Sequence, residues 1–553
     1  MNRAARGLHG MRGAAARACF CPQRQPHRER ESTVRRAVRS RLAAWFLCLA
    51  LPMVAARSGD LVLVRQYATT LCDESPDARQ TRHQVIALRR QGPAVMVRRG
   101  ATAMAPENSI ESCVAALSYG ADGCEVDVRR TRDGILVLFD DEALDRITDG
   151  FGPMRDATLR EMVSLRPKVA YGRPLFSSPP TFAALLDVAR QQNMLLDLHL
   201  REPGLESDVA RLLEEADAWD HVTHVSTPDT SRRFENARLR PLAYKARLCE
   251  NGRDMDPAAV AAALARPGAM LLVDDPRVAA RLLGRAPYQP LPYTTTFKIA
   301  AEPPLSTSLP PAGDFGSLAV TRALAALPHA NSASWLLELM AGRRNPAGPQ
   351  HRLTERAWAA RRLGDLGQKP RPVISALLRQ ARKPTPHPDR ASSGLDALTA
   401  IQALGQLGAT ECAGDLIGLL YRPPTRASRP GEGNLSADSG SQPRQTFEFR
   451  RTGYVLRALG ELPCGTSRRF LERYVRMDEV QARRFGPPQF DEATRALLHQ
   501  RLAWDDIARL LRSSNPGVRT TAILECLDAP TEERTLALRT AVPWALDLPR
   551  AKR

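Results

Sequence analysis

Apolar positions follow two different rhythms in the first half of the chain. Between residues 92 and 285, short apolar runs alternate with stretches in which apolar residues recur every three to four positions. The short runs are typical of buried strands and the longer stretches of amphipathic helices. Strands are predicted at 94–98, 123–128, 135–139, 194–200, 222–227, 242–247 and 269–274. This alternation predicts an α/β fold, either a parallel barrel or an open sheet.

Local signals add detail to this region. A helix is predicted over 110–118, with a capping box formed by Asn108 and Glu111, and residues 132–134 form a turn that joins two strands. The region has seven predicted strands in 194 residues, whereas a TIM-type barrel has eight strands in roughly 250 residues. We therefore expect a shortened or partly open barrel.

A different pattern begins near residue 315, where the end of one helix, a short turn and the start of a second helix recur. The motif occurs at residues 321, 359, 400, 455 and 522. Gly364 and Gly405 are 41 residues apart, which fits the helix pair of a HEAT-type repeat. The next interval, to Gly460, is 55 residues because a Pro-, Ser- and Gly-rich loop spans 422–444.

We interpret residues 315–545 as an α-solenoid of about five HEAT-like units, with an irregular helical bundle as the alternative. A solenoid offers an extended surface, so a protein partner is expected there. Residues 286–314 form a Pro-rich linker, with an additional strand at 293–299.

The N-terminus has the pattern of an export signal. Residues 1–57 contain 12 Arg and 2 Glu, and an apolar run at 42–56 ends in small residues. We predict a cleavable signal peptide and an exported protein, periplasmic or extracellular, with an N-terminal anchor as the alternative. The rest of the chain shows no apolar stretch approaching the roughly 20 residues of a membrane span, so none is expected in the mature chain.

Composition narrows the classes of function. The 553 residues carry a formal charge of +19, but the leader supplies +10 of it. Aromatic residues make up only 5% of the chain, and dense basic runs with interleaved aromatics are lacking in the mature sequence, so nucleic acid is not an expected partner. The scattered cysteines predict no disulfide framework, and Cys113 and Cys124 are expected in the core.

Candidate chemistry lies on two of the predicted strands. Glu125 and Asp127 are two residues apart on one strand, so their side chains point to the same face. Such a pair favours a hard divalent cation, Ca²⁺ or Mg²⁺. Asp197 on a later strand is a candidate third ligand, and His199 points the same way. The alternative is that the acids pair with nearby arginines: Arg98, Arg99 or Arg129.

Several short stretches between Val97 and Gly152 occur in an order and spacing that point to one family. They are 98–101, 105–109, 120–128, 131–134 and 140–146. Together they closely resemble the opening of the glycerophosphodiester phosphodiesterase family, and the likeness becomes weaker after Leu175.

The resemblance implies a TIM-type barrel that hydrolyses a glycerophosphodiester to glycerol 3-phosphate and an alcohol. The expected ligand is a glycerophosphodiester or a related phosphorylated small molecule. Glu125 and Asp127 match two metal ligands of the family, and Asp197 stands where the family has a later Glu. Arg99 matches an arginine that clamps the phosphate, and Arg98 beside it would add a second cation.

The resemblance also implies a defect in proton transfer, because the family's two catalytic histidine positions hold Arg98 and Phe139. Neither side chain can exchange a proton at neutral pH, and loss of such a group typically costs about 10²- to 10⁴-fold in rate. His199 is a candidate substitute base, whereas His221 and His224 are expected to be structural or exposed. Two hypotheses stay open: a metal-dependent phosphodiesterase, or an inactive relative that binds a metal and a phosphorylated ligand.

Overall fold

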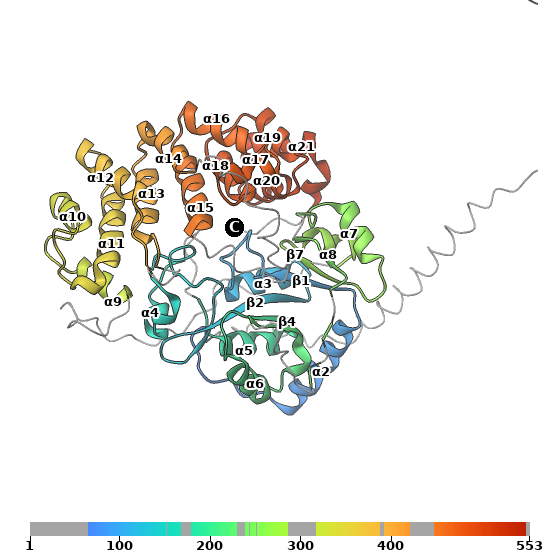
Figure 1. Cartoon of the computed structure of the whole chain (residues 1–553). Coiled ribbons are helices and arrows are strands. Elements are labelled where there is room, and N and C mark those ends of the chain that lie inside the picture. Colours follow the sequence, from blue (N-terminus) through green and yellow to red (C-terminus); the bar gives the residue numbers. More distant parts are fainter. Residues whose placement is uncertain are drawn as a thin grey trace, which may run out of the picture. The chain divides into compact units, whose positions relative to one another are not determined.

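The computed structural model describes residues 65–150, 152–167, 179–228, 238–239, 241–242, 244–249, 252–285, 317–387, 392–420 and 447–548 (Figure 1). The predicted leader, the linker with its additional strand, and the loop at 422–444 lie outside these residues. Within the described part, no helix is both long enough and apolar enough to cross a membrane.

The strands fall where the alternating pattern predicts them. They are β1 (Ala94–Arg98), β2 (Gly123–Arg130), β3 (Leu136–Leu138), β4 (Leu195–Leu200), β5 (Val222–Ser226), β6 (Ala246–Arg247) and β7 (Met270–Val273). In the described residues they form one sheet in the order β5-β4-β2-β1-β7-β6, in which neighbouring strands are parallel. Parallel strands buried on both faces read as continuous apolar runs, which explains why the sequence showed them clearly.

The strand β3 is joined to β2 by the turn predicted at residues 132–134. Among the strands of the described residues it pairs with β2 alone, and it runs antiparallel to it. The connection is the turn at residues 132–134, and a parallel crossover needs a dozen or more residues. The turn therefore closes a hairpin.

The sheet curls although its two outer strands are not paired in the described residues. The backbone N of Leu242 donates to the carbonyl of Thr223 on β5 at 2.8 Å, and the Tyr244 hydroxyl reaches Asp197 on β4. Residues preceding β6 thus approach the opposite edge of the sheet. The architecture is a parallel α/β half-barrel.

Helices precede, connect and follow the strands of the half-barrel. They are α2 (Pro76–Arg90), α3 (Ile110–Ser118), α4 (Leu159–Val163), α5 (Phe182–Gln192), α6 (Glu206–Glu215), α7 (Pro257–Leu264) and α8 (Arg277–Leu282). Cys113 on α3 and Cys124 on β2 are both fully buried, as predicted.

The start of α3 corrects the predicted capping box. The Ser109 hydroxyl accepts from the backbone N of Ser112 at 3.0 Å, and Ser112 completes the box. Asn108 is turned away from this role and binds Asp127 instead. Two serines three residues apart form the cap, whereas Asn108 belongs to the sheet edge.

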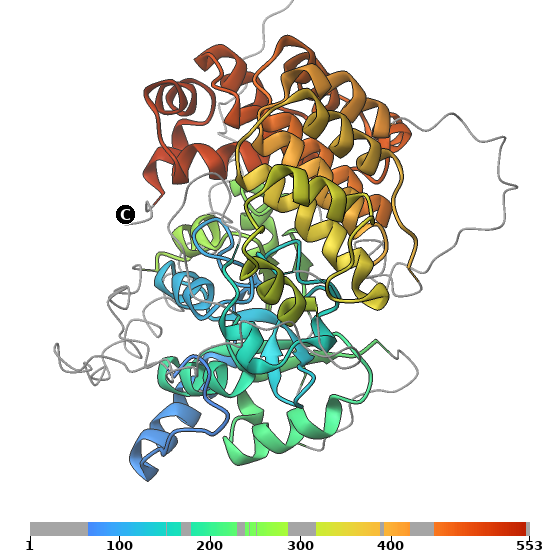
Figure 2. The same ribbon diagram turned by 90° about the vertical axis from the view of Figure 1, so that its left-hand side faces the viewer.

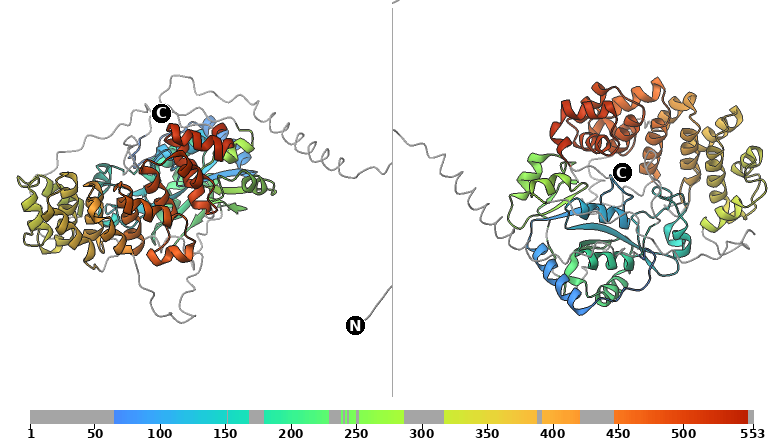
Figure 3. Two further views of the ribbon diagram at one scale, coloured as in Figure 1. Left: turned by 90° about the horizontal axis from the view of Figure 1, so that it is seen from above. Right: turned by 180° about the vertical axis from the view of Figure 1, so that it is seen from behind.

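The second half of the described chain consists of successive helix pairs, coloured from yellow to red in Figures 2 and 3. The pairs are α9 (Ser317–Ala325) with α10 (Ala333–Met340), α11 (Arg352–Asp365) with α12 (Arg371–Arg382), α13 (Leu395–Gln406) with α14 (Ala413–Leu420), α15 (Phe447–Gly460) with α16 (Gly465–Tyr474), α18 (Phe490–His499) with α19 (Trp504–Leu511), and α20 (Pro516–Asp528) with α21 (Glu532–Ala541); a short helix, α17 (Glu479–Ala482), precedes α18. The first helix of each pair packs on the first helix of the next. The recurring motif did not predict the pair α18–α19, because the end of α18 lacks the Leu-Gly signal.

The recurrent glycines mark close approach between successive first helices. A Cβ atom at Gly405 would lie 2.9 Å from the Ala458 Cα atom, nearer than such atoms approach in practice. The same holds for Gly364 against Ala403 and for Gly460 against Ala496. The repeat in the sequence therefore reflects repeated backbone contact.

Polar contacts join these helices to the half-barrel. Arg450 and Tyr454 on α15 bind the carboxylate of Asp145 at 2.5 and 2.6 Å, and all three residues are buried. Arg277 on α8 pairs with Asp528 on α20 at 3.1 Å. Both regions line one cavity of about 1940 Å³.

Candidate active site

Strand register brings the candidate side chains to one edge of the sheet. Glu125 on β2 is the register partner of Asp197 on β4, and Asp127 is the partner of His199. Alternate residues of a strand share a face. The sequence prediction that these four residues lie together on one face is confirmed.

The side of this edge nearest β1 is an arginine cluster, comprising Arg99, Arg146 and Arg201 with Glu107, Asp127, Asp140 and Asp141. Arg99 Nε lies 3.0 Å from Asp127 Oδ2 and its Nη2 lies 2.7 Å from Asp140 Oδ2. Arg99 Nη1 also donates to Glu107 at 3.2 Å. One guanidinium thus contacts three carboxylates.

Asp127 receives two further donors. Arg201 Nε donates to Asp127 Oδ1 at 2.5 Å, and the Asn108 side-chain amide donates to Asp127 Oδ2 at 2.8 Å. The Asp127 side chain is fully buried. Its carboxylate is therefore neutralised by arginine, as the alternative in the sequence analysis proposed, although Arg201 was not among the candidates.

The outer part of the arginine cluster is similarly paired. Arg146 Nη1 donates to Glu107 at 3.0 Å and Arg146 Nε to Asp141 at 2.5 Å. Burial would raise the pKa of Glu107, but Arg146 and Arg99 bring it down to about 2. Burial prevails at Asp141, where the pKa rises to about 6 despite Arg146.

The backbone at the end of β1 is shaped to present Arg99. Arg99 has a φ of 59° and Gly100 a φ of 80°, and a Cβ atom at Gly100 would lie 2.3 Å from the Ser112 hydroxyl oxygen. Only glycine fits this approach to α3. The Arg-Gly pair of the sequence is thus explained by a tight turn against the helix.

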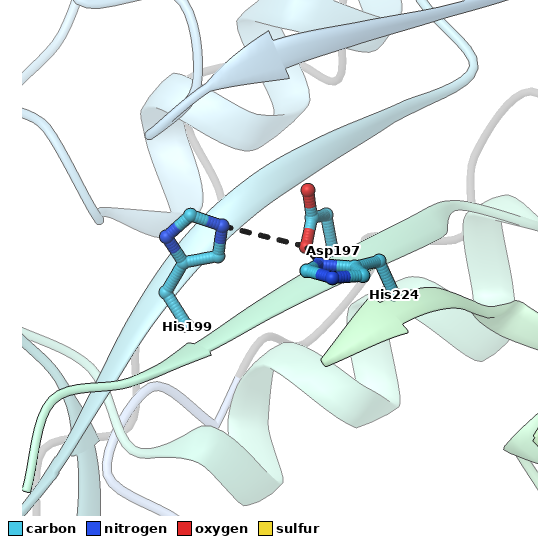
Figure 4. Close-up of side chains that lie close together, drawn as sticks. All are labelled: Asp197, His199 and His224. Atoms are coloured by element: carbon cyan, nitrogen blue, oxygen red, sulfur yellow. Dashed lines mark hydrogen bonds and ion pairs between the residues drawn. The ribbon is translucent and has the colours of Figure 1, made fainter. Parts of the chain in front are cut away.

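The other side of the edge is a histidine cluster formed by Asp197, His199 and His224 (Figure 4). His199 Nε2 lies 3.5 Å from Asp197 Oδ1, and His224 Nδ1 lies 3.1 Å from the same oxygen. One ligand atom from each residue falls within 4.8 Å of the others. Asp197 is fully buried, whereas the His224 side chain is 41% exposed.

Neighbouring groups fix the charge of the histidine cluster. Tyr244 donates its hydroxyl to Asp197 Oδ2 at 2.6 Å, and His199 Nε2 lies 3.4 Å from Glu125 Oε2. Burial would lower the pKa of His199, but Glu125 and Asp197 raise it to about 9. Burial would raise the pKa of Asp197, but the neighbouring His199 and His224 outweigh this effect and hold the pKa well below its usual range.

The two substituted family positions have different surroundings. Arg98 Nε donates to Asp274 Oδ1 at 2.8 Å, and both side chains are 26% exposed. Phe139 is fully buried in an apolar cluster with Val137 and Leu144. Arg98 therefore borders the cavity, whereas Phe139 is part of the core.

Several site residues were not identified from the sequence. Both His221 and His224 were expected to be structural or exposed; His224 contacts Asp197, and His221 is buried. Tyr244, Arg201 and Asn108 were not considered as site residues. The only sequence signal for these residues was that each is polar and stands in or near a predicted strand or helix.

Comparisons with known proteins link the half-barrel region to one family. Residues 99–229 match the family model described as the glycerophosphoryl diester phosphodiesterase family. A glycerophosphodiester phosphodiesterase of Caldanaerobacter subterraneus is 29% identical over 167 residues, covering 28% of this chain and 68% of that protein. Human glycerophosphodiester phosphodiesterase 1 is 39% identical over 74 residues, which cover 13% of this chain and only 22% of the human protein.

Solved structures of phosphodiesterases also resemble the chain. That of a glycerophosphodiester phosphodiesterase from Agrobacterium tumefaciens has a TM-score of 0.29 and 20% identity, covering 34% of this chain and 99% of the other. That of an Oleispira antarctica phosphodiesterase, solved with its product sn-glycerol-3-phosphate, has a TM-score of 0.25 and 23% identity, with coverages of 37% and 95%. The family match places a glycerophosphoryl diester phosphodiesterase family domain around residues 99–229 of this chain.

Proposed function

We propose that the half-barrel hydrolyses a glycerophosphodiester to glycerol 3-phosphate and an alcohol. The observation that carries the proposal is the family match over residues 99–229, a span that contains the arginine cluster and the three residues of the histidine cluster. Both clusters lie at the edge where strands of α/β proteins present their active sites.

A divalent cation is part of the proposal, because the family resemblance implies one. The expected set of Glu125, Asp127 and Asp197 fits only in part, since Arg99, Arg201 and Asn108 occupy the Asp127 carboxylate. Donors suited to a cation gather instead around Asp197. When bound there, a cation would polarise a phosphoryl oxygen as a Lewis acid.

Among the arginines, Arg98 is better placed than Arg99 to bind the phosphate. Arg99 already contacts three carboxylates and its side chain is only 10% exposed. Both arginines line the cavity. In the described residues, however, Arg98 forms an ion pair with Asp274 alone, and its side chain is 26% exposed. We assign Arg98 to the phosphate and Arg99 to positioning Asp127 and Asp140.

Two roles are open to His199, a proton carrier or a cation ligand. They exclude each other at the same nitrogen, because a coordinated imidazole nitrogen has no proton to give. A second candidate function, binding of a phosphorylated ligand without turnover, is favoured by the side chains at the two family histidine positions, Arg98 and Phe139.

Hydrolysis of a panel of glycerophosphodiesters by the full chain tests the proposal. Release of glycerol 3-phosphate should require a divalent cation and should be lost in Asp197→Asn, with His329→Gln as an exposed histidine control. Asp127→Ala is unsuitable, because it would also remove a buried carboxylate that pairs with Arg99 and Arg201. Equal release by Asp197→Asn would refute the proposal, and tight binding of glycerol 3-phosphate without release would favour the second candidate.

We also propose that the helix pairs are HEAT-like repeats that bind a protein partner, and that the leader exports the chain. The regular contacts of Gly364, Gly405 and Gly460 support the repeat assignment. Pull-down experiments with substitutions in residues 315–545 test the binding of a protein partner. Mass spectrometry of the mature N-terminus tests the export proposal.

A further inference from the structure

We propose that Asp197, His199 and His224 bind a borderline divalent ion of the zinc class, in preference to Ca²⁺ or Mg²⁺. The inference concerns the cation of the proposed function, but it rests on the geometry of the histidine cluster and does not require turnover.

The spacing of the donor atoms is that of ligands around one small ion. Zn²⁺ binds nitrogen and carboxylate oxygen at about 2.0 to 2.2 Å in tetrahedral sites, so adjacent ligand atoms lie about 3.4 Å apart. Asp197 Oδ1 lies 3.5 Å from His199 Nε2 and 3.1 Å from His224 Nδ1. The ligand atoms of His199 and His224 lie within 4.8 Å of each other, so the two imidazoles would close in on such an ion beside Asp197 Oδ1.

A hydrogen-bonded ion pair explains the position of His199 less well. A charge-assisted N–H···O bond is about 2.7 to 2.9 Å long. His199 Nε2 lies 3.4 Å from Glu125 Oε2 and 3.5 Å from Asp197 Oδ1, and no hydrogen-bond partner of this buried nitrogen is found in the described part of the chain. The imidazole approaches two carboxylates without bonding closely to either.

The kind of donor selects the class of ion. Ca²⁺ and Mg²⁺ prefer sites made of oxygen, whereas imidazole suits Zn²⁺ and its neighbours. Two of the three ligands here are imidazoles, and the oxygen-only alternative would need Asp127, which is bound by Arg99 and Arg201. Three protein ligands with a fourth position left for water or substrate are typical of catalytic zinc.

The surroundings of the histidine cluster support this assignment. Tyr244 binds Asp197 Oδ2 at 2.6 Å, which leaves Oδ1 directed at the two histidines. Such an outer hydrogen bond orients a ligating carboxylate. The partial exposure of His224 provides an entry path for the ion.

Titration calorimetry on the full chain after removal of metal by a chelator tests the inference. We expect about one equivalent of Zn²⁺ to bind, at least about 100-fold more tightly than Ca²⁺ or Mg²⁺. His199→Gln and His224→Gln should each weaken Zn²⁺ binding at least about 100-fold, because even an outer-partner mutation typically costs 10- to 100-fold. The matched control His329→Gln changes an exposed histidine and should bind Zn²⁺ as the parent does.

Unchanged zinc affinity in the double variant His199→Gln/His224→Gln would overturn the inference, as would stronger binding of Ca²⁺ or Mg²⁺ by the parent protein. If a variant fails to fold, zinc-edge X-ray absorption on the parent protein decides instead. Scattering from two imidazoles is expected, and a shell of oxygen alone would refute the site. Zinc binding without phosphodiester hydrolysis would support this inference and refute the proposed hydrolysis.

Discussion

The two clusters at the sheet edge differ in the groups that surround their buried carboxylates. In the arginine cluster, Asp127 has an arginine or amide partner at each oxygen, at 2.5 to 3.0 Å. In the histidine cluster, Asp197 Oδ1 is approached by two imidazoles at 3.1 and 3.5 Å. Arginine remains charged and fills the space permanently, whereas a protonated imidazole can give up its proton and bind a metal ion at the same nitrogen.

Acid spacing along a strand therefore does not identify metal ligands by itself. Glu125 and Asp127 share a strand and a face, yet one lies beside His199 and the other between two arginines. What distinguishes them is the cation contributed by neighbouring strands and loops. The comparison predicts that the arginine cluster contributes to stability and the histidine cluster to ligand binding.

The strongest test of this difference is Arg99→Met. Removal of the guanidinium leaves Asp127, Asp140 and Glu107 short of a cation, and breaking a buried pair typically costs about 3 to 5 kcal/mol. We expect a loss of that size in the free energy of unfolding, measured by urea denaturation.

Arg211→Met is the matched control, because Arg211 pairs with Glu215 in an exposed ion pair. Its unfolding free energy should stay within about 0.5 kcal/mol of the parent value. An equal, small effect of both substitutions would show that the arginine cluster is not structural.

His221 provides a histidine whose role is structural, for contrast with His199. Its Nδ1 donates to the Met194 carbonyl at 2.7 Å and its Nε2 accepts from Arg82 at 3.1 Å, so the ring is neutral. Burial, aided by Arg82, lowers the pKa of His221 to about 4. Its contribution to stability is present above the usual pKa of about 6.5 and is lost as the pH falls through 4.

We therefore expect the free energy of unfolding to fall by on the order of 3 kcal/mol as the pH is lowered from about 6.5 to about 4, since each pKa unit corresponds to about 1.4 kcal/mol. Urea denaturation at a series of pH values measures it. The slope attributable to His221 should vanish in His221→Gln, and an unchanged slope in that variant would contradict the assignment.

Much of this architecture could be predicted from sequence, because strand positions depend on local apolar runs. Contacts between strands could not be predicted in the same way. His224 reaches Asp197 through the register of β4 with β5, which includes an irregularity between Leu196 and Asp197. Register of this kind is set by packing and is not visible in either strand alone.

The same limit explains the other errors. Asn108 has the residue type of a helix cap, but tertiary contact with Asp127 takes it and Ser109 caps α3. The helix pair α18–α19 lacks the glycine signal, and the turn at its centre holds Arg501 at a φ of 43°, in the left-handed region that glycine favours. Local sequence patterns thus predicted most helices and strands, but not the side chains that meet between them.

The junction between the arginine cluster and the helices gives a smaller test. Tyr454→Phe removes a hydroxyl that donates to Asp145 at 2.6 Å, next to Arg146. A buried hydrogen bond to a charged group is worth about 1.5 to 3 kcal/mol, so a loss near 2 kcal/mol is expected. Hydrogen exchange should also rise in residues 141–149.

Tyr474→Phe is the matched control, since the Tyr474 hydroxyl accepts from the Gln489 backbone within the helical region. It should leave exchange at 141–149 unchanged. Equal exchange there in both variants would show that α15 does not support the sheet edge.

The smallest effect on stability is expected for Arg98→Met, although Arg98 is the neighbour of Arg99. Arg98 and Asp274 are each 26% exposed, and partly exposed ion pairs contribute about 1 kcal/mol or less. Because Arg98 lines the cavity, its loss should instead weaken binding of glycerol 3-phosphate, measured by calorimetry, by removing one cation. A large loss of stability with unchanged glycerol 3-phosphate binding would place Arg98 with the structural arginines. The opposite result would show that two adjacent arginines divide between support and recognition according to how many carboxylates each already contacts.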